Sequence, residues 1–187
     1  IQEKRLKQES NEEAAQQRTI ARIDRARGIT RFDASLGLKG ADELVRWQGD
    51  LLTTDSSALY RLQPGDVPGR FVRELPEVQQ VTCVAALGDR LLVGSSQLLV
   101  AEHRTASLQA KPIPVPGMRM CVHLQTSRRE GRAWLLYNAG VARIDRVDNE
   151  VRVTPLPQFE AATAVLAEEG EHIWVADRAG RLWRSLG

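Results

Sequence analysis

The chain has 187 residues, and its 26 Lys and Arg against 24 Asp and Glu give a formal net charge of +2. Hydrophobic residues make up 42% and charged residues 27%, which is within the range of globular proteins. No apolar run approaches the length of about 18 residues that a membrane helix needs. Binding to nucleic acid needs a cluster of positive charge, and the nearly balanced charges do not favour it.

Residues 1–27 contain neither Pro nor Gly and are rich in Glu, Gln, Lys, Arg and Ala, which favour a helix. Gly28 is a suitable residue to end this helix, because glycine is favoured just after a helix and basic side chains are favoured in its last turn. We therefore expect a helical connector over 1–27, ahead of a strand-rich domain over 28–187. The helix is either a solvated spacer or a docking helix for a partner protein, with Leu6, Ile20 and Ile23 as its anchors.

Beyond Gly28 the chain consists of short apolar runs separated by Gly, Asp, Asn, Ser or Pro, a pattern typical of strands joined by turns. Four stretches align with one another, and each reads as a polar turn, a strand, a tight turn and a second strand. The first strands of these units start 40, 43 and 39 residues apart. The aligned stretches are residues 48–62, 88–102, 131–145 and 170–184.

Further apolar segments flank these hairpins. They lie upstream at 81–87, 120–124 and 161–166, and downstream at 71–75, 113–115 and 151–156. Four strands per roughly 40 residues are the size and strand count of a β-propeller blade. The sequence thus predicts an all-β fold, a β-propeller with about four visible blades after an N-terminal α-helix.

The predicted ring is partial. Residues 28–33 match residues 140–145, so they supply the second half of a unit with no first half before it, and the last unit stops after its third strand. Either the N-terminal strands pair with this last unit, or the chain is a segment of a ring with more blades. Since four blades are the minimum of the usual range, we favour the second interpretation.

The unit from Trp134 to Asp145 has a Trp-led strand, a Gly turn and a strand that ends in Arg-apolar-Asp, and residues 173–184 and 28–33 match it in part. This pattern resembles the two-component regulator propeller repeat, with the quinoprotein-type propeller of outer-membrane assembly factors as a second resemblance. The resemblance implies a ligand-sensing or scaffolding module of a multidomain signalling protein. Its partners would be proteins or other domains of the same polypeptide.

The motifs of common catalytic sites do not occur in the sequence: it has no G-x-S-x-G, no Gly-rich phosphate loop and no kinase signature. His103, His123 and His172 fall at different points of different repeats, without metal-ligand spacing. We therefore predict no catalytic residue, no metal and no cofactor. Cys83 and Cys121 occupy matching positions in neighbouring repeats. We favour buried small side chains for them, and a redox pair across neighbouring blades is the alternative.

Partner binding is expected at the turns inside the hairpins, because propellers present loops at their rims. Trp47 precedes a Gly turn and is a candidate interface aromatic. Arg128 and Arg129 belong to a hairpin tip that is either solvated or in contact with an acidic partner. The candidate partner-binding residues are Trp47, Asp55, Ser56, Ser96, Gln97, Asn138, Arg178, Arg128 and Arg129.

Strong repeat order without a catalytic constellation favours a non-enzymatic module for protein interaction or ligand sensing within a larger signalling or multi-subunit assembly. The alternative is a fragment of a propeller hydrolase or lyase whose active site is completed by further blades. A third option is a structural subunit of a large complex. The compartment stays open between cytoplasm and periplasm.

Overall fold

The structure is a computed structural model that describes residues 20–24, 28–32, 37–38, 40–63, 69–104, 107–169 and 172–186. These residues form antiparallel strands, with one short 3-10 turn, η2 (Pro157–Phe159). The predicted all-β class is thereby confirmed. No helix among the described residues has the length and apolar character to cross a bilayer.

Four of the sheets follow one another along the chain, and in each the strands pair in sequence order. Sheet I contains β3 (Glu43–Trp47), β4 (Asp50–Thr54), β5 (Leu59–Gln63) and β6 (Arg70–Glu74). Sheet II contains β7 (Cys83–Leu87), β8 (Arg90–Gly94), β9 (Leu98–Arg104) and β10 (Ser107–Ile113). Sheet III contains β11 (Cys121–Thr126), β12 (Arg132–Tyr137), β13 (Gly140–Val147) and β14 (Glu150–Leu156). Sheet IV contains β15 (Ala162–Glu169), β16 (His172–Asp177) and β17 (Leu182–Leu186).

The two strands of each aligned hairpin are the second and third strands of a sheet, and they lie close to where the sequence places them. Sheet IV contains three strands, as expected. Two strands differ from the prediction. The fourth strand of sheet II was expected at 113–115, but β10 ends at Ile113, since its pattern is polar on one face. Strand β3 was not predicted at all, because only Leu44, Val45 and Trp47 mark it as apolar.

Sheets II and III bury apolar side chains on both faces. On β8, Leu91 and Val93 pack toward sheet I, whereas Leu92 packs toward sheet III. On β12, Trp134 points into the cluster shared with sheet IV and Leu135 into the cluster shared with sheet II. Because successive side chains of a strand point to opposite faces, a strand between two packed sheets must be apolar at every position. This requirement explains the unbroken apolar runs of the repeats.

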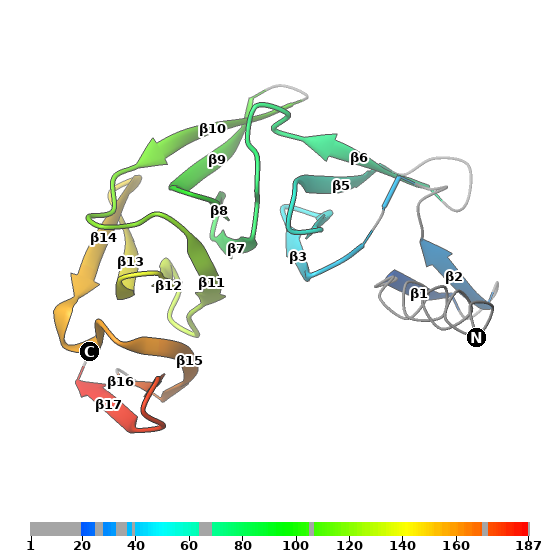
Figure 1. Cartoon of the computed structure of the whole chain (residues 1–187). Helices are drawn as coiled ribbons and strands as arrows, with labels where there is room; N and C mark the ends of the chain where they lie inside the picture. Colours follow the sequence, from blue (N-terminus) through cyan, green and yellow to red (C-terminus); the bar gives the residue numbers. More distant parts are fainter. Residues whose placement is uncertain are drawn as a thin grey trace, which may run out of the picture.

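The sheets are arranged along an arc (Figure 1). Their first strands β3, β7, β11 and β15 lie on its concave side, and the outer strands β6, β10 and β14 lie on its convex side. Neighbouring first strands are in contact from β3 to β7 and from β7 to β11. Apolar clusters fill the spaces between sheets I and II, II and III, and III and IV. Among the described residues the core therefore consists of three interfaces between sheets and a smaller cluster around Leu38 and Phe71 on sheet I, rather than one central cluster.

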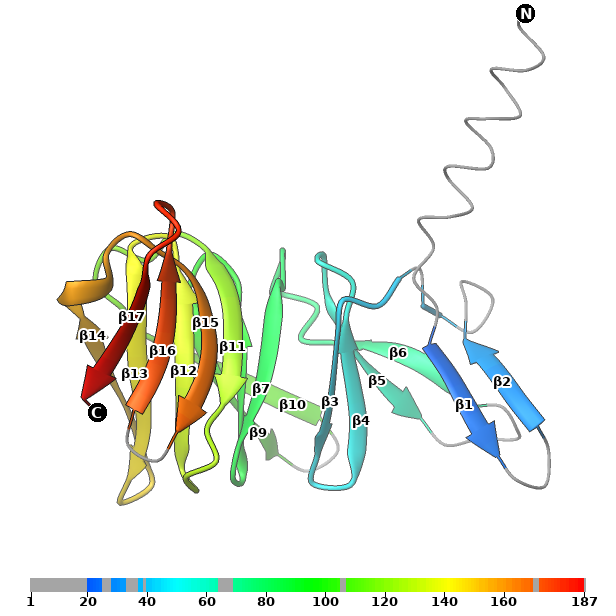
Figure 2. The same ribbon diagram turned by 90° about the horizontal axis from the view of Figure 1, so that it is seen from below.

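The antiparallel order also creates two rims, which are seen edge-on in Figure 2. We define the upper rim as the edge that carries the turns between the second and third strands, at 55–58, 95–97, 138–139 and 177–181, together with the connections between sheets. The lower rim carries the turns between first and second strands and between third and fourth strands.

The prediction of a helix over 1–27 is wrong for residues 20–24, which form strand β1 (Ile20–Asp24) paired with β2 (Gly28–Phe32). Ile20 and Ile23 are therefore not anchors of a docking helix, and Leu6 lies outside the described residues. Backbone pairing with β2 and two β-branched side chains favour the strand here, since a helix without an apolar stripe gains little on its own. The same hairpin gives residues 28–33 the preceding strand that the sequence interpretation lacked.

Candidate functional site

A polar residue opens each hairpin turn on the upper rim and holds it through its side chain. In sheet I this residue is Asp55, whose carboxylate accepts hydrogen bonds from the main-chain N–H groups of Ser57 and Ala58, both at 3.0 Å, and from the Tyr60 hydroxyl at 2.9 Å. Burial raises the pKa of Asp55, but the hydrogen bonds from Ser57, Tyr60 and Ala58 outweigh it and lower the pKa overall.

Asp177 has the same role in sheet IV. Its carboxylate accepts hydrogen bonds from the N–H groups of Ala179 and Arg181 at 2.9 Å, from Arg181 Nε at 2.7 Å and from Trp183 Nε1 at 3.0 Å. The bond from Trp183, followed by those from Arg181, lowers the pKa of Asp177 to about 2. This carboxylate is a structural anion and stays ionised at neutral pH.

Asn138 in sheet III joins its turn to the connection that precedes the sheet. Its Oδ1 accepts hydrogen bonds from the N–H groups of Arg119 at 2.6 Å and Met120 at 3.0 Å, and its Nδ2 donates to the carbonyl of Gly117 at 3.0 Å. In sheet II, Ser95 Oγ donates to the carbonyl of Gln97 at 3.1 Å. The predicted site residues Asp55 and Asn138 therefore shape the rim.

Four further members of the predicted set, Ser56, Ser96, Gln97 and Arg178, are exposed on the upper rim. Ser56 Oγ donates to Asp42. Ser96 and Gln97 line a depression of about 510 Å³ between the β6–β7 connection and the end of β10. With Asp55 and Asn138, the structure thus brings six predicted residues to one edge of the molecule, and it places Ser96 and Gln97 in a concave surface.

Two other predicted positions lie elsewhere. Arg128 and Arg129 are exposed in the β11–β12 turn, which belongs to the lower rim. Trp47 is only 2% exposed and stacks on His103 of sheet II, with ring centroids 4.8 Å apart. The prediction that Trp47 is an interface aromatic is wrong, because the Gly turn that follows it directs the strand end into the space between sheets I and II.

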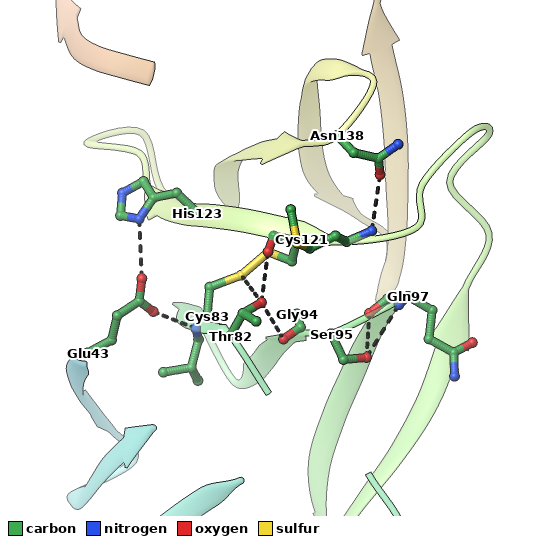
Figure 3. Close-up of a disulfide and its surroundings, with 11 residues drawn as sticks. Glu43, Thr82, Cys83, Gly94, Ser95, Gln97, Cys121, His123 and Asn138 are labelled. Carbon is green, nitrogen blue, oxygen red and sulfur yellow. Dashed lines mark hydrogen bonds and ion pairs between the residues drawn. A yellow bond between two sulfur atoms is a disulfide. The ribbon is translucent and has the colours of Figure 1, made fainter. Parts of the chain in front are cut away.

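The first strands of sheets II and III are joined by a disulfide between Cys83 and Cys121 (Figure 3). Their Cα atoms are 6.6 Å apart, and both side chains are buried. Thr82 Oγ1 donates to the carbonyl of Cys121 at 2.8 Å, so a hydrogen bond reinforces the covalent link. The two side chains are buried, as the favoured interpretation expected, but they are bonded to each other across neighbouring repeats, as in the alternative.

A polar network crosses the concave side of the same strands. Glu43 of β3 accepts a hydrogen bond from the Val84 N–H of β7 at 2.7 Å, and its other carboxylate oxygen lies 3.2 Å from His123 Nδ1 of β11 (Figure 3). The hydrogen bond to Glu43 raises the pKa of His123. Sequence analysis missed Glu43, and its only sequence signal is its place at the start of an apolar strand.

Among the described residues, no group of three or more His, Cys, Asp and Glu side chains is placed to hold a metal ion. Comparison with protein-family models found no match, and a search of curated proteins found no significantly similar sequence.

Proposed function

We propose that the four sheets are blades of a β-propeller and that the protein is a non-enzymatic module for protein interaction or ligand sensing within a larger signalling or multi-subunit assembly. The observation that carries this proposal is the repeated packing of three- and four-stranded meanders face to face, with every first strand on the concave side. A module built in this way exposes turns at two rims, and partners reach it there.

The resemblance to two-component regulator propellers is part of the proposal, and the Arg-apolar-Asp element supports it. In sheet III, Asp145 accepts from Arg143 Nε at 2.7 Å and from Arg132 Nε at 2.8 Å. Comparable ion pairs join the second and third strands of the other four-stranded sheets, Arg61 with Asp50 in sheet I and Arg90 with Glu102 in sheet II. A repeated ion pair near one rim is expected of units that descend from one repeat.

The upper rim is the proposed partner surface. Ser96, Gln97 and Arg178 are exposed there, above turns held by Asp177 and by Ser95. Rigid turns present side chains without a large loss of conformational entropy on binding, which favours affinity. The disulfide also bears on the compartment, because buried disulfides persist in oxidising environments, and we infer the periplasm rather than the cytoplasm.

Site-specific photo-crosslinking in the natural host tests the interaction function. The crosslinking amino acid replaces Gln97 or Arg178 on the upper rim, and in the matched control it replaces Asp148, which is exposed in the β13–β14 turn of the lower rim. We expect discrete crosslinked species from the upper-rim positions and none from the control. Absence of crosslinks from both upper-rim positions, or equal crosslinking from both rims, contradicts the proposal.

A further inference from the structure

The upper rim carries an elongated concave surface that crosses from sheet II to sheet III. It consists of three adjoining depressions, of about 510, 450 and 400 Å³, which we call the upper trough. The first two share Gln97 and Pro112, and the second and third share Pro116. Because neighbouring depressions have common walls, one extended ligand can occupy all three.

The charges of the upper trough have one sign. Glu77 lines the first depression and Glu160 lines the third, and neither depression nor the one between them is lined by a described Lys or Arg. Both glutamates are exposed, and neither is ion-paired with a described residue. Arg73, Arg119 and Arg178 are exposed near the trough but do not line it. Among the described residues, the charged groups that a ligand inside the trough meets are therefore the two carboxylates.

The middle of the trough is apolar and poor in hydrogen-bond donors. Leu98, Ile113, Val115 and Met118 line the second depression, together with three prolines, Pro112, Pro114 and Pro116. Proline has no N–H group, so the three proline positions offer a ligand only carbonyl oxygens and apolar ring surface. A matching ligand brings N–H donors and apolar side chains in alternation, which is what an extended peptide does.

We propose that the upper trough binds an extended peptide segment with basic side chains at its ends and apolar side chains between them. This inference rests on the proposed interaction function and names the chemical class of its partner. The Gln97 amide, in the wall between the first two depressions, is placed to donate to a peptide carbonyl there. The two glutamates select the charge of the peptide, and the proline-rich middle selects its apolar side chains.

Fluorescence anisotropy with two labelled decapeptides tests the proposal on the intact chain. Both probes have the same alternating Val and Thr centre, and one carries Arg at its ends where the other carries Glu. We expect the Arg peptide to bind at least about tenfold more tightly, with a preference that shrinks as salt is added. Equal binding of the two peptides, or binding of neither, overturns the proposal.

Variants then locate the binding. The double substitution Glu77→Gln and Glu160→Gln should abolish the preference for the Arg peptide, whereas Glu130→Gln, an exposed glutamate of the lower rim, should leave it unchanged. Gln97→Trp should fill space in the first two depressions, which share Gln97, and lower the affinity for the Arg peptide about tenfold. Thermal unfolding of each variant checks that the fold is kept. Unchanged binding in the folded double variant overturns the assignment to the trough.

The two proposals fail in different ways. If upper-rim crosslinks form in cells but neither decapeptide binds, the interaction function stands and the peptide class is wrong. If the Arg peptide binds in the trough but no upper-rim crosslink forms, the trough chemistry stands and the cellular role is wrong. A neutral oligosaccharide mixture serves as a third probe, and its preferential binding would replace the peptide by a sugar and overturn the inference.

Discussion

At the scale of single residues, Asp177 shows how one carboxylate organises a turn. Its four hydrogen bonds come from two main-chain N–H groups and from the side chains of Arg181 and Trp183. All four donate to the ionised form, which is why the pKa lies at about 2. A carboxylate with a folded pKa below its unfolded pKa of about 3.9 stabilises the protein above that pH and loses this effect as the pH falls.

We expect Asp177→Asn to lower the thermal midpoint at neutral pH, because the amide loses the charge that Arg181 and Trp183 contact. The difference between wild type and variant should shrink as the pH falls from about 4 toward about 2, where Asp177 becomes protonated. Thermal unfolding followed by circular dichroism over this pH series measures it. A difference that stays constant down to pH 2 would contradict the assigned role.

Gly94 is required for a different reason, since its Cα faces the disulfide. A Cβ at this position would overlap the sulfur atoms of both Cys83 and Cys121. We expect Gly94→Ala to destabilise the protein by about 1–3 kcal/mol through overpacking. Urea unfolding measures the change, and Gly40→Ala is the matched control because its added Cβ meets no atom within 4 Å. A loss in the control as large as that in Gly94→Ala would refute the explanation.

At the scale of elements, the disulfide ties β7 to β11 across 38 residues of sequence. In the chain-entropy description, a loop of this length restricts the unfolded state by roughly 3–4 kcal/mol. We expect Cys83→Ser with Cys121→Ser to lower the free energy of unfolding by about that amount. Urea unfolding in oxidising buffer measures the loss, and in reducing buffer wild type and variant should become nearly equal. If the reductant left the free energy of unfolding of the wild type unchanged, the disulfide would not be the source of this stability.

The Glu43–His123 contact couples β3 to β11 and depends on pH. Since Glu43 raises the pKa of His123 in the folded state, the pair stabilises the protein below about pH 6.5 and loses its effect as the pH rises through the folded pKa. Side-chain exposure of His123 is 46%, so we expect only a few tenths to about 1 kcal/mol.

The test is the pH dependence of unfolding in His123→Gln and Glu43→Gln. Both variants should lose the same stability increment below pH 6.5, and the Glu43→Gln carbonyl can still accept the Val84 N–H. His172→Gln serves as the control, since His172 contacts the carbonyl of Ser185 and not Glu43. Different pH profiles for the two variants would show that the Glu43–His123 contact is not the source of the pH-dependent stability.

At the scale of the whole molecule, the arc depends on apolar interfaces that each join only two sheets. Trp134 is 1% exposed and packs with Phe159, Ile173 and Val175 between sheets III and IV. Removing it should leave a cavity at one interface and leave the other two intact. Sheet IV then becomes the part of the molecule that separates first.

We expect Trp134→Ala to cost about 3–5 kcal/mol and to expose the connection at 157–161 to protease. Limited proteolysis with mass spectrometry should therefore release sheet IV before sheets I–III are cut. The control is Leu182→Ala, since Leu182 is 57% exposed and its removal should change stability by less than about 0.5 kcal/mol. Uniform cleavage along the Trp134→Ala chain would mean that the sheets unfold as one unit.

The repeating features of this fold can be predicted from sequence because their causes are local. The apolar runs of β8 and β12 follow from strand periodicity, and the turn residue Asp55 follows from the hydrogen bonds that Asp makes within a few residues. One local signal was overlooked: residues 20–24 read IARID and residues 141–145 read VARID, so the first segment resembles a strand as well as a helix.

By itself, then, the amino-acid sequence determined the all-β class, the number of units and the polar turns of the rim. Tertiary structure alone decided that Trp47 is buried, that Cys83 is bonded to Cys121 and that Glu43 meets His123, 80 residues away. The physical reason is separation along the chain. A strand or a turn is stabilised largely by its neighbours in sequence, whereas these contacts form only where separate sheets pack, and no short sequence pattern encodes which sheets pack together.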